Sequence, residues 1–176
     1  TFLQNYTPSA TCGLVFVEDN LWIEGTVNGK LTIVSADLVN SNIETDIVLV
    51  NNINYSTLAG TDGLTAIAEE DVMISPKSPD DMTIRGIFIA QTGRFGRNYY
   101  GTEYGYAADD VYKNSLTMNG TVVSNGRVGT KWFCPSYCSG YNTRFNSYDQ
   151  TQAKNPPPLT PYTSDDFRFI EWREER

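Results

Sequence analysis

The sequence contains no histidine, which removes the most common general base and the most common ligand of transition metals. It has no uninterrupted apolar run of about 18 residues, the length expected of a membrane-spanning helix. We therefore expect contact with a membrane only through a segment outside these residues. Basic residues are few, since 13 Lys and Arg stand against 21 Asp and Glu, and the net charge is −8. A phosphate backbone is repelled on average by such a chain, so nucleic acid is a disfavoured partner.

Amphipathic helices are also missing, because no segment repeats its apolar residues with helical periodicity. Short runs that alternate apolar and polar residues take their place, and Asn, Asp, Gly, Ser or Pro closes each run. The clearest segment spans 21–36, where two alternating runs flank an Asn28-Gly29 turn of the type that joins hairpins. Further strands are predicted at 13–17, 46–50, 64–68, 72–74, 82–90 and 116–123. The apolar residues expected to form the core are Ile23, Leu31, Ile33, Ile47, Leu49, Leu64, Ile84, Leu116 and Val122.

This ladder of short strands predicts an all-β fold in a chain whose length suits one domain. The runs recur at intervals of about 15 to 20 residues, as in the repeats of a β-solenoid. Connections such as 36–42 and 51–62 are longer than hairpins need, which favours parallel stacking. A β-sandwich with Greek-key connections stays the alternative, because it also gives short strands separated by turns.

The single domain, 1–176, divides by composition into five parts. They are an N-terminal cap and strand at 1–20, solenoid rungs at 21–93, a Tyr-rich loop at 94–113, the last rungs at 114–130, and a C-terminal part at 131–176. This last part holds a cysteine loop, the proline-rich segment 155–161 and an aromatic end. We expect the proline-rich segment to be an extended polyproline strap on the surface. Phe167, Phe169 and Trp172 are expected to cover the stack.

Cys134 and Cys138 lie in the segment CPSYC, where a spacing of four residues can close a small disulfide ring. A free pair of thiols is the first alternative. A metal site is the second, although it needs further ligands elsewhere. Cys12 is left without a partner in any of these arrangements.

Several stretches in order resemble the β-helical ectodomain of bacterial minor-pilin-like cell-surface proteins. They are LWIEGTVNGKLTI, GLTAIAEEDVMI, IRGIFIAQTGRFGRNYY, SLTMNGTVVSNGRVGTKW, YDQTQAKNPPPLTPY and FRFIEWREE. The resemblance spans 21–173 and implies a right-handed parallel β-helix displayed outside the cell, with a role in pili, adhesion or surface structure. It implies no catalytic residues. The membrane helix that precedes the solenoid in that family has no match here.

The Tyr-rich loop interrupts the ladder and is the predicted binding site. Its rings are flat and amphipathic, with hydroxyl tips, which suits a cell-surface glycan or a protein partner such as another pilus subunit. The alternative is that the rings pack onto the flank of the stack and hold the loop down. The candidate binding residues are Tyr99, Tyr100, Tyr104, Tyr106, Arg97 and Glu103.

Four acidic groups, at 69–71, 80–81, 109–110 and 165–166, offer oxygen ligands of the kind that Ca²⁺ prefers. None has the spacing of a calcium loop, so we interpret them as solvated turns, with Asp109 and Asp110 as the weak candidates for a metal. We predict no cofactor and no catalytic residue. A polysaccharide lyase or hydrolase of this fold would need Arg85, Arg94 or Arg97 beside Asp80, Asp81 or Asp109.

These patterns together predict a non-enzymatic extracellular domain, a structural or adhesive part of a pilin-like or adhesin-like protein. A polysaccharide-degrading enzyme is the first alternative, and the capture of DNA at a pilus tip is the second.

Overall fold

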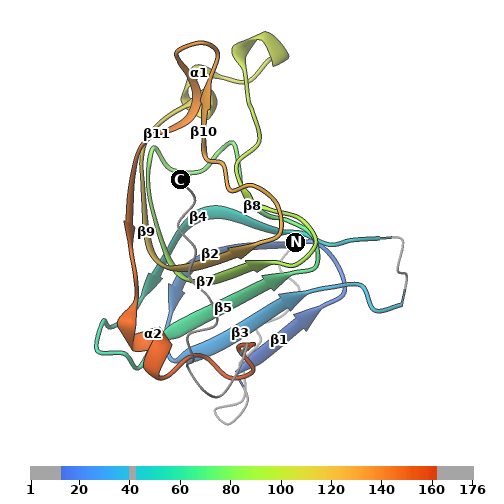
Figure 1. The fold of residues 1–176 in the computed structure, drawn as a ribbon, viewed down its shortest axis with the longest axis vertical. Coiled ribbons are helices and arrows are strands. Elements are labelled where there is room, and N and C mark those ends of the chain that lie inside the picture. The colour runs from blue at the N-terminus through green and yellow to red at the C-terminus, as the bar shows by residue number, and fades with distance from the viewer. Residues whose placement is uncertain (1–12, 40–42, 162–176) are drawn as a thin grey trace, which may run out of the picture.

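The computed structural model of this chain describes residues 13–39 and 43–161 and is drawn in Figure 1. The predictions for 1–12, for Cys12 and for the aromatic C-terminal cap lie outside the described residues. The strands are β1 (Leu14–Val17), β2 (Leu21–Val27), β3 (Lys30–Ser35), β4 (Ile47–Tyr55), β5 (Gly63–Ala68), β6 (Val72–Ile74), β7 (Asp81–Ala90), β8 (Phe95–Gly96), β9 (Tyr112–Ser124), β10 (Lys131–Phe133) and β11 (Tyr137–Ser147). A 3-10 turn, η1 (Thr102–Tyr104), and two short helices, α1 (Ala108–Val111) and α2 (Gln150–Lys154), complete the described elements. None of the described helices has the length and apolar character needed to cross a membrane.

All eleven strands join one sheet in which every pairing except β10 with β11 is parallel. The all-β prediction is therefore confirmed, and the antiparallel β-sandwich is wrong. The Asn28-Gly29 turn is not a hairpin, because β2 pairs with β4 whereas β3 pairs with β1 and β5. It is a corner at which the chain leaves one group of strands for another, and Gly29 takes the left-handed φ of 88° that the corner requires.

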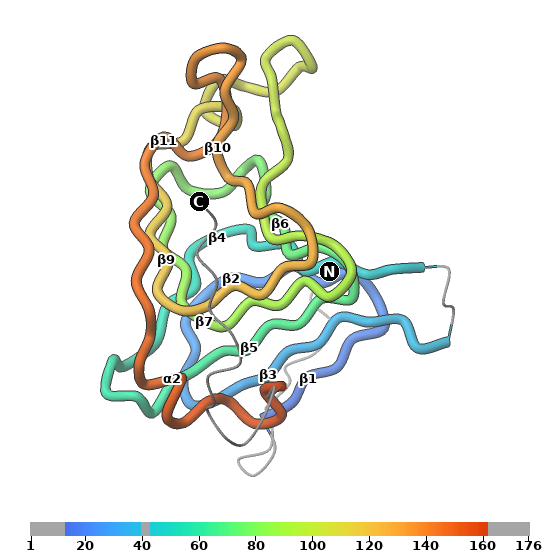
Figure 2. The backbone as a smooth tube through the Cα atoms, viewed as in Figure 1, coloured from blue at the N-terminus to red at the C-terminus, as the bar shows by residue number. Residues whose placement is uncertain are grey.

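The pairings fall into three stacks of strands. The first stack contains β1, β3, β5 and the second halves of β7 and β9. The second contains the first halves of β2 and β4, then β6 and β8. The third contains the remaining halves of β2, β4, β7 and β9, with β11 at its end. From β1 to β9 the chain visits the stacks in a constant order, and we call one such passage a circuit. Strand β10 belongs to none of the stacks, because it pairs only with β11. The tube in Figure 2 shows successive circuits lying side by side.

A ladder of side-chain hydrogen bonds links equivalent residues of successive circuits where the chain enters the second stack. Asn20 Oδ1 accepts the N–H of Asp46 at 2.8 Å, and Asp46 Oδ1 accepts the N–H of Asp71 at 2.9 Å. Asp71 Oδ1 then accepts the N–H of Arg94 at 2.7 Å. This Asx ladder, made of Asn20, Asp46, Asp71 and Arg94, gives the backbone at the corner a partner where sheet pairing has not yet begun.

The space between the stacks is filled by the apolar residues that the alternation predicts. Five of the nine predicted core residues are buried, namely Ile47, Leu49, Leu64, Ile84 and Leu116. The other four, Ile23, Leu31, Ile33 and Val122, are partly buried and pack against them. The rings of Phe88 and Phe95 join this core with their centroids 5.8 Å apart. The core prediction is therefore confirmed.

The C-terminal part departs from the sequence prediction in two ways. Residues 137–147, expected to be a cysteine loop and irregular chain, form strand β11, which pairs in parallel with β9 and extends the third stack. The proline-rich segment is not extended throughout, because Leu159 has a φ of 60°. It does lie along the surface as predicted: Thr160 Oγ1 is 2.7 Å from Thr65 Oγ1, and Thr32 Oγ1 donates to the carbonyl of Pro158. The threonines that make these contacts, Thr32 and Thr65, belong to the first stack. The proline pattern did not indicate which strands the segment would contact.

Gly86 and Gly120 pair with each other at the bend where β7 and β9 pass from the third stack to the first, and both have positive φ. A Cβ on Gly120 would overlap the carbonyl oxygen of Gly86. We expect Gly120→Ala to lower the free energy of unfolding by at least about 2 kcal/mol, since strain and overpacking add. Gly25→Ala is the matched control, because Gly25 also has positive φ but nothing lies within 4 Å of its Cβ position. Urea denaturation of both variants checks this, and equal losses would contradict it.

Burial raises the pKa of Asp46 above its ordinary value of 3.8, and the nearby Asp71 and Glu44 charges add to the effect. The folded state therefore holds the Asp46 carboxyl proton more tightly than the unfolded state does. As a result, the contribution of Asp46 to the free energy of unfolding falls as the pH rises from about 3.8 through the raised pKa. Asp46→Asn keeps an acceptor for the Asp71 N–H, as Asn20 does one circuit earlier. We expect it to stabilise the protein at pH 7 by less than about 1 kcal/mol, since partial exposure screens the charge.

The difference between Asp46→Asn and the parent should vanish at about pH 3, where both side chains are neutral. Urea denaturation at the two pH values measures it. A variant less stable than the parent at pH 7 would show that the carboxylate charge strengthens the ladder more than burial penalises it.

Candidate functional site

A protrusion rises from one side of the stacked strands at the top of Figures 1 and 2. It consists of 97–112, which carries η1 and α1, and of 131–140, which forms the β10–β11 hairpin. We call these two segments the aromatic protrusion. The predicted disulfide joins Cys134 to Cys138, with their Cα atoms 5.8 Å apart, and closes the tip of the hairpin.

Arg97 is the buried centre of this protrusion, with only 1% of its surface exposed. Its Nη1 lies 3.5 Å from Ser139 Oγ on the hairpin, and its Nη2 donates to the backbone carbonyls of Pro76 and Asp110. Its guanidinium carbon lies 4.7 Å from the centre of the Tyr100 ring. Burial lowers the pKa of Arg97 below its ordinary value, yet an arginine keeps its charge at neutral pH. As placed, Arg97 holds three segments together beneath the surface and does not reach a ligand on it.

The four candidate tyrosines form two groups of rings. Tyr99 packs edge-on against Tyr104, with centroids 6.1 Å apart, and against Trp132, with centroids 5.9 Å apart. Tyr100 and Tyr106 form the second pair at 4.8 Å. Tyr104 is 70% exposed, whereas Tyr100 lies half-buried over Arg97. Each group therefore has one exposed ring, Tyr104 in the first and Tyr106 in the second, while the other rings are partly buried and hold the loop in place.

Glu103 is engaged by a neighbour within the same group. The Tyr99 hydroxyl donates to Glu103 Oε1 at 2.7 Å. This hydrogen bond raises the pKa of Tyr99 to about 12 and lowers the pKa of Glu103. Tyr99 is therefore protonated and Glu103 ionised at neutral pH. Because the Tyr99 proton is already donated to Glu103, both oxygens can act as acceptors beside the rings.

Trp132 belongs to this site, although the sequence analysis did not single it out. Its indole N–H donates to the Arg97 carbonyl at 3.1 Å, and its ring completes the Tyr99 group. It stands 33 residues from Tyr99 in the sequence, two positions before Cys134, so no spacing rule connects the two. The run Trp132-Phe133 beside Cys134 was the available signal, because aromatics next to a disulfide-closed tip are held in place.

The candidate acids are occupied in structural roles or stand apart. Asp109 and Asp110 begin α1, and within 13–39 and 43–161 no three Asp, Glu or Cys side chains gather as a metal site. Asp80 forms an ion pair with Lys113 at 3.2 Å, while Asp81 accepts hydrogen bonds from Asn114 and Ser115. The arginines that an enzyme of this kind would place beside these acids bond elsewhere. Arg85 donates to Asn119, and Arg94 donates to Asn98.

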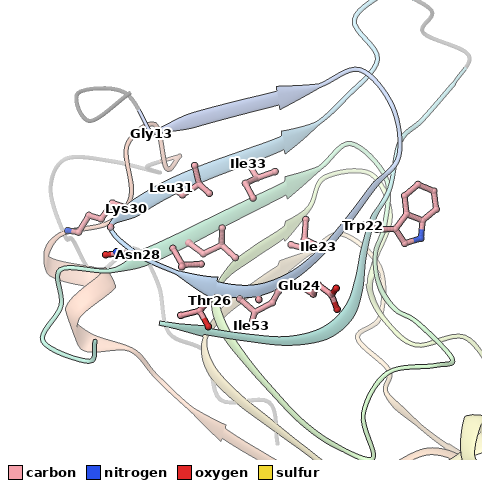
Figure 3. Close-up of a pocket in the computed structure, with 14 residues that line it drawn as sticks. Gly13, Trp22, Ile23, Glu24, Thr26, Asn28, Lys30, Leu31, Ile33 and Ile53 are labelled. Atoms are coloured by element: carbon pink, nitrogen blue, oxygen red, sulfur yellow. The ribbon is translucent and has the colours of Figure 1, made fainter. Parts of the chain in front are cut away.

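Two of the cavities bear on function. The larger, about 840 Å³, is a groove between β2 and β3, where the first circuit leaves the core side chains Ile23, Leu31 and Ile33 partly open. Figure 3 shows Trp22 and Lys30 pointing outward at its two ends. The smaller, about 440 Å³, adjoins the aromatic protrusion and has Trp132 and Phe133 in its wall. The two cavities differ in chemistry, because the first is an extension of the apolar core and the second carries several cationic side chains.

A comparison of the chain with protein-family models, curated proteins and solved structures found no match. The resemblance to minor-pilin-like proteins therefore stays a prediction, and the site must be interpreted from its own geometry.

Replacing Arg97 by Met removes hydrogen bonds to Pro76, Asp110 and Ser139 while keeping most of the side-chain volume. We expect a loss of about 2–3 kcal/mol of stability, because buried acceptors lose a charged donor. Hydrogen exchange of 98–111 should accelerate, while exchange in β5 and β7 stays unchanged. Arg94→Met is the control, since the Arg94 guanidinium bonds only Asn98 among the described residues. Unchanged exchange in 98–111 would show that the rings alone hold the protrusion.

Proposed function

We propose that this chain is a non-enzymatic cell-surface domain that binds a glycan through the aromatic protrusion. The observation that carries the proposal is the packed group of Tyr99, Tyr104 and Trp132, in which Tyr104 is exposed and the other two rings are partly buried. The buried Arg97 lies beneath this group and accepts the indole N–H of Trp132 at its carbonyl. Preorganised rings of this kind lose little conformational entropy when they bind. The faces of sugar rings pack on aromatic rings, and the Tyr99 and Glu103 oxygens lie beside them to bond hydroxyl groups.

The proposed scaffold is a parallel β-solenoid. The constant order in which the chain visits three stacks supports it, as does the Asx ladder between equivalent residues. We further propose that the solenoid is right-handed, since crossover connections between parallel strands have that hand almost without exception. A solenoid fits a display role, because the protrusion is an insertion between two circuits and leaves the stacking of β7 on β9 intact.

We also propose an extracellular location, at the cell surface or as part of a pilus-like structure. The Cys134–Cys138 disulfide supports it, because disulfides persist in oxidising compartments. The resemblance to minor-pilin-like ectodomains points the same way. The net charge of −8 continues to disfavour the capture of DNA.

A protein partner, such as another subunit, is the second candidate for the same surface. Tyr104 and Phe133 are 70% and 66% exposed, and large exposed aromatics are typical of the centres of protein interfaces. A polysaccharide-degrading enzyme has less support. Acid–base hydrolysis needs two free carboxyl groups at a fixed separation, whereas Asp80 and Asp81 are both held by neighbours.

A glycan array probed with the whole chain tests the proposal. We expect the double variant Tyr99→Ser with Tyr104→Ser to bind its glycan at least about tenfold more weakly, because the central rings of a binding surface dominate its energy. Tyr148→Ser is the matched control, since Tyr148 is also exposed but lies beyond β11, outside the protrusion.

An unchanged array profile for the double variant would remove the aromatic surface as the binding site. Release of reducing or unsaturated sugar ends from a bound glycan, measured on the same samples with and without Ca²⁺, would replace the binding role by the enzymatic one.

A further inference from the structure

The cavity of about 440 Å³ beside the aromatic protrusion has an unusual charge for this protein. Four of the 13 basic residues of the chain line it, although the net charge is −8. Among residues 13–39 and 43–161, no acidic residue lines it, and the only ion pair within these ranges, Lys113 with Asp80, is not part of its wall. The residues that matter are Arg94, Arg127, Lys131, Arg144, Trp132 and Phe133.

The cationic groups have hydrogen-bonding capacity to spare. The side chains of Arg127 and Arg144 are exposed, and neither donates to another residue in the ranges that the structure describes. Arg94 uses one terminal nitrogen to bond Asn98 at 2.7 Å. Lys131 donates to the backbone and side-chain oxygens of Asn142, and its ammonium lies 5.1 Å from the centre of the Phe133 ring. Two complete guanidinium forks and part of a third are therefore available to a ligand.

Stability does not account for this arrangement. Gathering four like charges around one cavity is unfavourable unless an opposite charge enters it. Arg127 lies in the turn after β9 and Arg144 on β11, so two separate segments bring their charges to the same place. Within residues 13–39 and 43–161, neither side chain forms a hydrogen bond or ion pair whose loss would weaken the fold. The arrangement fits recognition of an anion, because guanidinium groups bind planar oxyanions with two parallel hydrogen bonds.

We infer that this cavity binds the anionic sugar of an acidic glycan, with a uronate carboxylate facing Arg127 and Arg144 and the sugar ring against Trp132 and Phe133. The inference rests on the proposed function and deepens it, because Trp132 belongs to both the cavity wall and the Tyr99 group. A volume of about 440 Å³ suits a single sugar unit with water. The rings of Tyr99 and Tyr104 then hold neighbouring sugar units of the same glycan.

Nucleic acid is the competing polyanion, and the charge distribution favours the glycan. Phosphate backbones carry closely spaced charges that extend along the protein surface, where this chain is acidic on average. An acidic glycan carries one charged group on each acidic sugar ring. One basic cavity flanked by aromatic rings therefore matches one acidic sugar and its neighbours. Single-stranded DNA serves as a probe in the test for this reason.

The test measures affinity of the whole chain, at about 50 mM salt, for two pairs of polymers that differ mainly in charge. The first pair is polygalacturonate and its methyl ester, and the second is dextran sulfate and dextran. We expect polygalacturonate to bind at least about tenfold more tightly than its ester, because each ester removes a charged acceptor. The double variant Arg127→Gln with Arg144→Gln should abolish most of that preference while leaving the melting temperature unchanged.

The matched control is Lys77→Gln with Lys154→Gln, which makes the same change in net charge at exposed lysines outside the cavity wall. It should keep the preference.

Equal affinity for the charged and neutral polymers, or a preference that survives Arg127→Gln with Arg144→Gln, would overturn the inference. Binding of neutral glycans that is lost with Tyr99→Ser and Tyr104→Ser would leave the proposed function standing in that case. Equally tight binding of single-stranded DNA would overturn the assignment to a glycan, and a response to dextran sulfate but not to polygalacturonate would overturn the choice of carboxylate.

Discussion

The register between successive circuits is the constraint on which the rest of this structure depends. Parallel strands without hairpins have no turn to fix their register, so the alignment must come from the side chains. The apolar residues between the stacks supply part of it, and the Asx ladder from Asn20 to Arg94 supplies the rest at the corner. A shift of one residue would turn the core side chains toward solvent and break the ladder at the same time.

The candidate site is rigid because the register of the strands fixes the two ends of the segment that forms it. The chain leaves the stack after Arg97, and returns at β9 in register with β7, so the ends of the insertion are fixed. A buried guanidinium then bonds three segments that are distant in sequence, and a disulfide closes the opposite tip. Rings attached to such a base are held in place before any ligand arrives. In the proposed function, the neighbouring rings and the basic cavity beyond Trp132 face the ligand.

Much of the fold was predictable because period-two alternation depends on local side-chain burial alone. The strands at 46–50, 64–68 and 82–90 and the buried Ile47, Leu49 and Ile84 follow from it directly. The prediction of a hairpin at Asn28-Gly29 was wrong, because the same dipeptide occurs in hairpins and at corners. Only the pairing partners of the flanking strands distinguish the two. Strand β11 was missed because its exposed half lacks apolar alternation and is held by pairing with β9.

The sequence by itself determined the strand-rich class, the apolar core, the acidic balance, and the Tyr-rich and cysteine segments as departures from the ladder. These are local or compositional properties that no tertiary contact can reverse. The tertiary structure decided that Arg97 lies beneath the rings, that Trp132 joins Tyr99, and that Arg94, Arg127, Lys131 and Arg144 share one cavity. The physical reason is that stacking places residues from separate circuits side by side, a relation that depends on the register of the strands and on no spacing within the sequence.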